Sequence, residues 1–475
     1  MRDTTNLRKA IPADVRELCT RLREGGFRSW AVGGAVRDEL LAEISGERLE
    51  RTDWDVATDA RPDDVTKLFR RVIPTGIQHG TVTVLLAGGQ YEVTTLRGET
   101  TYSDGRRPDG VYFVDDIKDD LARRDFTINA IAYDVLDDRL IDPFGGLADL
   151  ETKTLRAVGD PATRFAEDGL RVLRAARFVA TLEVTLEAET ERAIEPSLAS
   201  YAKVSAERVR DEWLKAMKAK QPSRAFEVMR KHGLLAITAP ELLESVGCEQ
   251  NKYHAFDVWN HALRCLDECP PLAVLRVAGL FHDVGKPRSR AFSEKNRDYT
   301  FYEHDRIGAE MADPILSRLR FSNDERTRVV ALVRHHILCY DESWSDAAVR
   351  RWLRRVGPEL APDLYALGRA DILAKGREAN RDLENLAALA AHVERVISQG
   401  AAFGTKDLAI DGRDLMQELS LEPGRQIGEL LRALLEEVVE RPELNTREKL
   451  IELARKILAG IGGAGASPIN EKKQS

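Results

Sequence analysis

The sequence predicts an α+β protein, in which a head of mixed strands and helices precedes a long all-helical region. Residues 81–86 and 90–97 alternate apolar and polar side chains around a Gly-Gly pair, a pattern typical of a β-hairpin. Beyond about residue 150 the spacing of apolar residues becomes helical almost throughout. Residues 142–146 contain one proline and two glycines, and they predict a hinge between the two regions.

These changes of pattern divide the 475 residues into five predicted segments. Residues 1–145 form the head, and residues 146–245 form an Arg- and Lys-rich helical neck and body. Residues 246–380 contain a cluster of histidines, and residues 381–458 form a C-terminal helical region. Residues 459–475 are rich in Gly and Ala and then polar, so we predict a disordered tail there.

Composition narrows the class of protein. Charged residues make up 32% of the chain, the net charge is −8, and no apolar run approaches the length of a membrane span. The N-terminal residues lack the apolar core of a signal peptide, and the five cysteines are sparse and odd in number. We therefore expect a cytoplasmic protein without a membrane partner. Because the total charge is acidic, any contact with RNA requires a local basic surface.

The head contains a predicted phosphate-binding turn. Residues 30–32 are apolar and predict a short strand, Gly33 and Gly34 form a turn after it, and a helix follows that carries Arg37. Glycines let backbone N–H groups approach a ligand closely, and a helix N-terminus favours anions. The arrangement suits a nucleoside triphosphate.

Two carboxylates follow this turn. Asp53 and Asp55 are expected on a strand, where alternation places both on one face while Trp54 points away. Two adjacent carboxylates facing a phosphate site are what a pair of Mg²⁺ ions needs for phosphoryl transfer. Glu92 is a candidate third carboxylate, on a strand that we expect to pair beside this one. The alternative is that these are ordinary surface acids.

Further along, charged residues are predicted to bind a nucleotide. Arg123 and Arg124 carry guanidinium forks that match phosphate oxygens, and Asp125 and Asn129 could hold a ribose hydroxyl. An Asp acceptor beside an Arg donor imitates the pairing edge of a base, and three-residue spacing predicts such a pair on one helix face. The pair is Asp168 with Arg171, and Arg174 and Arg177 are further candidate phosphate ligands. Surface ion pairing is the alternative explanation for each.

Four motifs in this order resemble the class II tRNA nucleotidyltransferase and bacterial poly(A) polymerase superfamily. They are Gly33-Gly34 with Arg37-Asp38, Asp53-x-Asp55, residues 123–130, and Glu167-Asp168-x-x-Arg171. The resemblance implies a polymerase-β-like head followed by helical neck, body and tail. It further implies that Asp53 and Asp55 hold the metals, that Arg124 and Asp125 select a ribonucleotide, and that Asp168 and Arg171 select C or A.

The expected activity is template-independent addition of CCA to tRNA from CTP and ATP, with no DNA partner. Residues 74–81 lack the Gly-basic-basic-Phe signature of the poly(A) polymerases, which favours tRNA, and residues 102–108 resemble an intact flexible loop, which favours the A step. A-only, CC-only and poly(A) activities remain alternatives. So do an HD phosphohydrolase with a decayed head and a non-catalytic RNA-binding protein. A monomer or a homodimer is expected.

Five of the nine histidines lie between residues 261 and 336. His261, the pair His282-Asp283, and Asp371 form a mixed N/O set suited to Mn²⁺, Ni²⁺, Co²⁺ or Fe²⁺. The pattern resembles the HD phosphohydrolase superfamily, which implies a second activity on 2′,3′-cyclic or 2′-phosphate ends. His304 and one of His335 and His336, with His336 favoured, extend the set to a second metal. Histidines that cap helices or satisfy core hydrogen bonds are the alternative.

Overall fold

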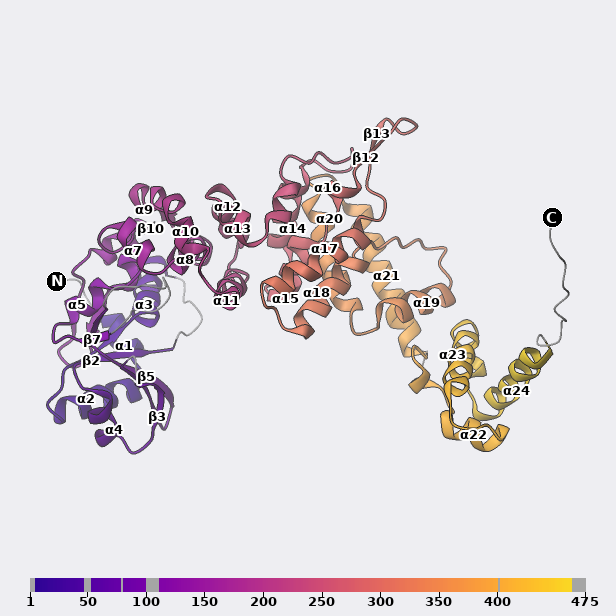
Figure 1. The fold of residues 1–475 in the computed structure, drawn as a ribbon, viewed down its shortest axis with the longest axis horizontal. Helices are drawn as coiled ribbons and strands as arrows, with labels where there is room; N and C mark the ends of the chain where they lie inside the picture. Colours follow the sequence, from indigo (N-terminus) through magenta and orange to yellow (C-terminus); the bar gives the residue numbers. More distant parts are fainter. Residues whose placement is uncertain (1–4, 47–52, 78–79, 100–110, 400–401, 464–475) are drawn as a thin grey trace, which may run out of the picture. The chain divides into compact units, whose positions relative to one another are not determined.

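A computed structural model describes residues 5–46, 53–77, 80–99, 111–399 and 402–463 (Figure 1). The chain forms two compact units, which we describe separately. The first contains residues 1–243, 271–273 and 315–322, and the second contains the remaining residues. The predicted loop 102–108, part of segment 74–81, and residues 464–475 lie outside the described residues. Within the described ranges, no helix is both long and apolar enough to cross a membrane.

The head is built on a seven-stranded sheet with the order β3-β4-β5-β2-β1-β8-β9. Strand β4 pairs antiparallel with β5, so the predicted hairpin is confirmed. At the centre, β2 pairs parallel with β5 and antiparallel with β1. The sheet strands are β1 Ser29–Val32, β2 Asp55–Thr58, β3 Val72–Gly76, β4 Thr81–Leu86, β5 Gly89–Thr95, β8 Ala132–Asp134 and β9 Arg139–Ile141.

The head also contains helices, and in the described part of the chain four short strands outside the main sheet lie in the head and neck. Buried Trp30, Val32, Leu96 and Leu121 belong to one hydrophobic core of the head. The head helices are α1 Thr5–Ala10, α2 Ala13–Glu24, α3 Gly34–Ser45, α4 Pro62–Leu68, α5 Ile117–Ala122, η2 Thr127–Asn129 and α6 Gly146–Glu151. The short strands are β6 Arg97–Glu99, β7 Val111–Phe113, β10 Thr154–Leu155 and β11 Thr185–Leu186.

The predicted strand, glycine turn and helix are confirmed, because β1 ends at Val32 and α3 begins at Gly34. The expected strand over Asp53–Ala57 is wrong at its start, since β2 begins at Asp55. The register of β1 with β2 ends at the pair Val32 and Asp55, and the chain then turns away into α3. Asp53 has no β1 residue left to pair with, so it lies before the strand and is exposed.

The neck and body are helical, as predicted, but Asp168 and Arg171 do not share one helix. Helix α7 ends at Glu167, Asp168 is extended with φ −141°, and α8 begins at Leu170. The Oδ1 atom of Asp168 accepts a hydrogen bond from the Leu170 N–H at 3.0 Å, which favours a new helix start. The helices here are α7 Pro161–Glu167, α8 Leu170–Thr181, α9 Ala188–Arg192, α10 Leu198–Tyr201, α11 Ala206–Ala216, α12 Ser223–Lys231 and α13 Leu234–Thr238.

The second unit is a group of helices with one small hairpin, formed by β12 Ala291–Ser293 and β13 Asp298–Thr300. Figure 1 shows this hairpin projecting beyond α16 and α20. The helices that surround the histidines include α14, which packs against α20. They are α14 Val258–Glu268, α15 Ala273–Phe281, α16 Lys286–Ser289, α17 His304–Arg318, α18 Asn323–His335, α19 Asp346–Val356, α20 Ala361–Ala374 and α21 Asn380–Ser398.

The C-terminal helices have a core of their own. Buried Leu415, Leu434, Val438 and Leu450 lie at its centre. The helices are α22 Gly412–Leu419, α23 Arg425–Glu440 and α24 Arg447–Gly463. The predicted start of a disordered tail at residue 459 is wrong, because α24 continues to Gly463. Ala459 and Ile461 extend a helix that is already formed, and adding a residue to an existing helix costs little.

Candidate functional site

A cleft of about 550 Å³ in the first unit collects most of the residues predicted to bind nucleotide. Asp53 and Glu92 are not among its lining residues. Arg208 and Lys215, two basic neck residues that the sequence makes candidate phosphate contacts, also line it, and Leu170 and Phe178 are additions that the sequence analysis did not select. The predicted residues in the lining are Gly33, Gly34, Arg37, Asp55, Arg123, Arg124, Asp125, Asn129, Asp168, Arg171, Arg174 and Arg177.

Among the described residues, Asp55 is one of three carboxylates that line this cleft. It opens β2 and lies in register with Glu92 of β5, so the two side chains project to the same face of the sheet. Burial, with Glu92 and Asp53 nearby, raises the pKa of Asp55 to about 6, although Arg124 opposes this. A half-buried carboxylate with a raised pKa, next to other carboxylates, is a site whose charge a divalent cation would neutralise. The residues present therefore fit a divalent metal.

Gly33 allows close packing around Asp55. Its φ of +79° is rarely adopted by other residues, and a Cβ there would lie 3.3 Å from Asp55 Oδ2. The same Cβ would lie 3.5 Å from Arg124 Nη1. The glycine thus brings backbone, carboxylate and guanidinium together at the N-terminus of α3.

Asp125 and Asn129 form the buried base of the cleft. Burial opposes the charge of Asp125, but Arg174, whose Nε donates at 2.7 Å, and Asn129, whose Nδ2 donates at 2.9 Å, hold its pKa well below the usual range. The Asn129 Oδ1 accepts from Arg37 at 2.6 Å. In this structure both side chains are engaged in orienting Arg37 and Arg174.

Asp168 and Arg171 both line the cleft, but each has other partners. Asp168 Oδ2 lies 2.6 Å from Arg208 Nη2, a residue on α11. Arg171 lies 2.6 Å from Glu167 and donates to the carbonyl of Arg123 at 3.0 Å. The Arg- and Lys-rich sequence of the neck makes Arg208 a candidate phosphate contact, but its pairing with Asp168 was not predicted.

In the second unit, the structure brings together all six of the predicted metal ligands. His261 Nε2 lies 2.9 Å from Asp371 Oδ1, and His282 Nε2 lies 3.1 Å from Asp283 Oδ2. The other oxygen of Asp283, Oδ1, lies 3.4 Å from His304 Nε2 and 3.6 Å from His336 Nε2. Asp283 therefore connects two groups of potential ligands, His261/His282/Asp371 and His304/His336.

Backbone carbonyls set the tautomer of three of these imidazoles. The Nδ1 atoms of His282, His304 and His336 lie 2.7–2.8 Å from the carbonyl oxygens of the residues three positions earlier. A carbonyl only accepts, so each Nδ1 carries a proton and each Nε2 presents a lone pair when the ring is neutral. This orientation is typical of metal-binding histidine, and the donor set fits a transition metal.

Burial and neighbouring charges shift the pKa values of the histidines in the cluster. Burial opposes the charge of His282, but Asp283 and Asp371 raise its pKa to about 9. Burial lowers the pKa of His304 to about 4. Lys286 Nζ lies 2.6 Å from Asp283 Oδ2 and donates to Gln250 at 2.7 Å.

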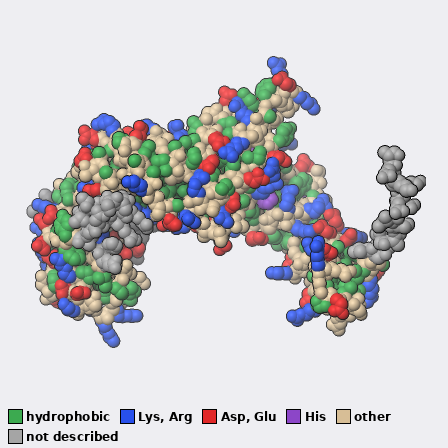
Figure 2. All heavy atoms as spheres, in the orientation of Figure 1, with side chains coloured by type: hydrophobic (Ala, Val, Ile, Leu, Met, Phe, Trp, Pro, Cys, Tyr) green, Lys and Arg blue, Asp and Glu red, His purple; other side chains and the backbone are tan. Residues whose placement is uncertain are grey.

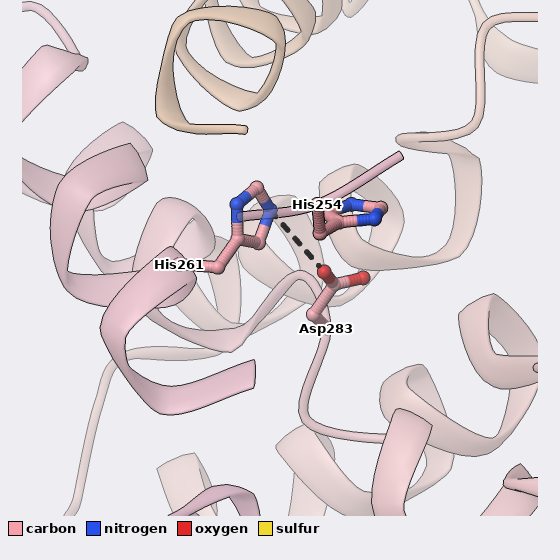
Figure 3. A group of neighbouring side chains, drawn as sticks. All are labelled: His254, His261 and Asp283. Carbon is pink, nitrogen blue, oxygen red and sulfur yellow. Dashed lines mark ion pairs between the residues drawn. The ribbon is translucent and has the colours of Figure 1, made fainter. Parts of the chain in front are cut away.

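His254 belongs to this cluster and was missed by the sequence analysis. Figure 3 shows it beside His261 and Asp283, and its ring centroid lies 5.0 Å from that of His261. Burial, with Lys286 adding to the effect, lowers the pKa of His254 to about 3. Its position seven residues before His261 was the available signal. His335 does not line the cavity above the cluster, whereas His336 does.

Family comparisons match three parts of the chain. Residues 29–156 match the Poly A polymerase head domain, and residues 183–245 match an RNA and SrmB-binding site of polymerase A. Residues 304–454 match a family described as tRNA nucleotidyltransferase domain 2.

Similar proteins cover most of the sequence. The CCA-adding enzyme of Ligilactobacillus salivarius is 32% identical over 457 residues, which is 95% of this chain and 96% of that protein. The A-adding tRNA nucleotidyltransferase of Deinococcus radiodurans is 37% identical over 421 residues, or 85% and 90% of the two chains. The CCA-adding enzyme of Lactobacillus gasseri is 46% identical over 230 residues, which span 48% of this chain and only 56% of that relative.

A solved structure has the same fold along the chain. The crystal structure of the Bacillus stearothermophilus CCA-adding enzyme in complex with CTP has a TM-score of 0.71 and 27% identity. The match covers 96% of this chain and 100% of that one.

Proposed function

This chain belongs to the tRNA nucleotidyltransferase and poly(A) polymerase family, and on that premise we propose that it adds the 3′-terminal CCA to tRNA from CTP and ATP. The observation that carries the proposal is one cleft in which a carboxylate, a glycine turn at a helix N-terminus and several arginines meet. Phosphoryl transfer needs these parts: a metal ligand, donors for a triphosphate, and a cationic surface for charge that develops in the transition state.

We assign the metal-holding role to Asp55 and Asp53, with Glu92 as a third carboxylate, and Mg²⁺ as the ion. When bound, Mg²⁺ would acidify the tRNA 3′-hydroxyl and neutralise the departing pyrophosphate. The chain's own contribution is to position the substrates. The backbone at Gly33 and Gly34 and the guanidinium of Arg124 bind the triphosphate, and the pair of Asp125 with Arg174 keeps the floor of the cleft rigid.

Selection of the base is assigned to Asp168 and Arg171. A carboxylate accepts from the exocyclic amine that C and A share, and a guanidinium donates to a ring acceptor. Their present partners, Arg208 and Glu167, would be exchanged for the base when a nucleotide binds. Because G and U lack that amine at the corresponding position, they would leave Asp168 unpaired.

Pyrophosphate release tests the proposal. Purified protein with Mg²⁺, CTP or ATP, and tRNA that lacks its 3′ end should release pyrophosphate, and Asp53→Ala and Asp55→Ala should abolish the release while thermal unfolding stays cooperative. Wild-type turnover in Asp55→Ala would refute the assignment. An A-only enzyme would respond to ATP and tRNA ending in CC, but not to CTP.

The histidine cluster supports a second function, a metal-dependent phosphohydrolase of the HD type. We assign one metal to His261, His282, Asp283 and Asp371, and another to Asp283, His304 and His336. The expected reaction adds water across a P–O bond of a 2′-phosphate or 2′,3′-cyclic phosphate, and the ribose oxygen leaves with a proton. Metal-loaded protein that hydrolyses neither substrate would refute it.

A further inference from the structure

The cavity above the histidine cluster has an aromatic rim that neither proposed activity explains. We propose that Tyr253 and Tyr302 stack the nucleobases of a single-stranded RNA 3′ end, so that this cavity binds a nucleotide end more tightly than a small phosphate. The inference rests on the proposed hydrolytic function of the cluster. Both tyrosines line the cavity of about 740 Å³, yet Tyr253 is 63% exposed and Tyr302 is 77% exposed.

Tyr253 is exposed, but hydrogen bonds hold the backbone on both sides of it. The N–H of Lys252 donates to Asp298 of β13 at 3.1 Å, and the N–H of Ala255 donates to the carbonyl of Lys375 at 2.9 Å. These bonds fix the backbone on both sides of Tyr253 to segments far along the chain. A ring held in the open on a fixed backbone loses little conformational freedom when it stacks on a base.

Tyr302 is similarly placed, between β13 and α17. Its neighbour Phe301 is buried, and the Phe301 carbonyl accepts from His304 Nδ1 at 2.7 Å. Tyr302 therefore lies two residues from a metal-ligand candidate, and Tyr253 lies next to His254. Both rings line the same cavity as the ligand candidates Asp283, His304, His336 and Asp371, so a base on either ring would lie in the cavity that contains them.

The cavity lining carries both signs of charge, because its lysines lie among Asp283, Asp298, Asp371 and Asp382. Lys286 pairs with Asp283, and Lys375 pairs with Asp382. The lysines of the lining are Lys252, Lys286 and Lys375, and the Lys252 ammonium lies 5.3 Å from the centre of the Tyr253 ring. The turn of the β12–β13 hairpin adds Lys295 and Arg297, and Figure 2 shows basic side chains at the end of this projection. Side-chain amides of Asn251, Asn296 and Asn385 offer both donors and acceptors.

Exposed aromatic rings that stack any base, with a lysine beside one of them, are features of proteins that bind single-stranded nucleic acid. Inorganic phosphate or a small phosphomonoester would contact the floor of the cavity and leave the rim unused. A stacked base is worth about fivefold to 160-fold in binding. We therefore expect the two tyrosines to increase the affinity for nucleotides and to leave the affinity for small phosphates unchanged.

The test compares two phosphomonoesters, adenosine 2′-monophosphate and glycerol 2-phosphate, with metal-loaded full-length protein. The double variant Tyr253→Ala/Tyr302→Ala should raise the KM for the adenosine ester about tenfold or more and leave kcat, and both constants for glycerol 2-phosphate, within about twofold. The double variant to Phe keeps the rings and should behave as wild type. Nucleotide addition to tRNA serves as the control for folding.

A second measurement separates this inference from the hydrolytic function. A single-stranded dinucleotide containing 2-aminopurine is titrated into metal-free wild type and the double Ala variant, and fluorescence quenching reports stacking. Weaker binding to the Ala variant, with recovery in the Phe variant, supports the platform even where wild type hydrolyses nothing. Equal binding to all three proteins, or an equal rise of KM for both esters, overturns it.

Discussion

The Nε2 atoms of His304 and His336 lie 3.2 Å apart, although the Nδ1 atom of each ring donates to a backbone carbonyl. Two neutral rings in this arrangement direct lone pairs at each other, which is unfavourable unless a cation lies between them or one ring is protonated. Asp283 Oδ1 lies within 3.6 Å of both atoms and supplies a negative charge. The fixed Nδ1 protons therefore leave a position between the two rings that suits a cation.

Metal binding should stabilise the second unit. We expect Mn²⁺ at about 100 times its Kd to raise the free energy of unfolding by about 3 kcal/mol, since it binds the folded chain. His304→Ala should lose one metal equivalent by elemental analysis. His392→Ala removes another buried histidine of the same unit, one that pairs with Asp346, and should keep the full metal content. Equal metal content in wild type and His304→Ala would contradict the assignment.

The raised pKa of Asp55 predicts a pH-dependent effect of Asp55→Asn. Because the folded chain binds this proton more tightly than the unfolded chain, protonated Asp55 favours folding, and that contribution is lost as the pH rises through about 6. In chelator at pH 8, Asn should therefore raise the free energy of unfolding by about 3 kcal/mol, and at pH 4, close to the ordinary Asp pKa of 3.8, by less than about 1 kcal/mol. Thermal melts at both pH values measure this. A variant less stable than wild type at pH 8 would contradict it.

Gly33→Ala should damage activity more than stability. Its positive φ costs about 1 kcal/mol for alanine, and the new Cβ would crowd Asp55 Oδ2 and Arg124. Gly46→Ala is a matched control, with φ +74° and, among the described residues, nothing within 4 Å of the new Cβ. We expect similar losses of stability but a decrease in nucleotide addition, about 100-fold or more, only for Gly33→Ala. Equal activity of the two variants would contradict the close packing.

Asp125→Asn should lower the free energy of unfolding, because Asp125 pairs with Arg174 at the buried base of the cleft. Arg174 would lose its buried carboxylate partner, which costs about 3 kcal/mol in comparable pairs. Because Arg174 and Asn129 depress the pKa of Asp125, the contribution to stability is present above the ordinary Asp range and disappears in acid. Urea unfolding at pH 7 measures the loss. A loss below about 0.5 kcal/mol would contradict the coupling.

Local patterns predicted the parts of the site that depend on local structure. The turn at Gly33 follows from a strand, two glycines and a helix contiguous in sequence, and the pairing of β4 with β5 follows from alternation. Local patterns could not show that a helix break separates Asp168 from Arg171. A Cβ at Gly169 would lie 2.3 Å from the carbonyl oxygen of Ser200, so packing against a distant segment fixes that break.

His254 illustrates the same limit in the second unit. Its loop is held by hydrogen bonds from Lys252 to Asp298 and from Ala255 to Lys375, both remote in sequence. The spacing of His282-Asp283 and Asp371 was visible as a pattern, whereas the location of His254 depends on these tertiary contacts. The partner of Asp168 likewise comes from the packing of α11, whereas Glu167, the partner of Arg171, is only four residues away in sequence.

The most direct test of the central claim is the sequence of the product's 3′ end. Purified protein is incubated with Mg²⁺, CTP and ATP, and with tRNAs ending at the discriminator base, at C, or at CC. We predict that every tRNA grows to CCA and then stops. An unlimited A tail, addition of C alone, addition of A to the CC end alone, or no addition would contradict CCA synthesis by this cleft.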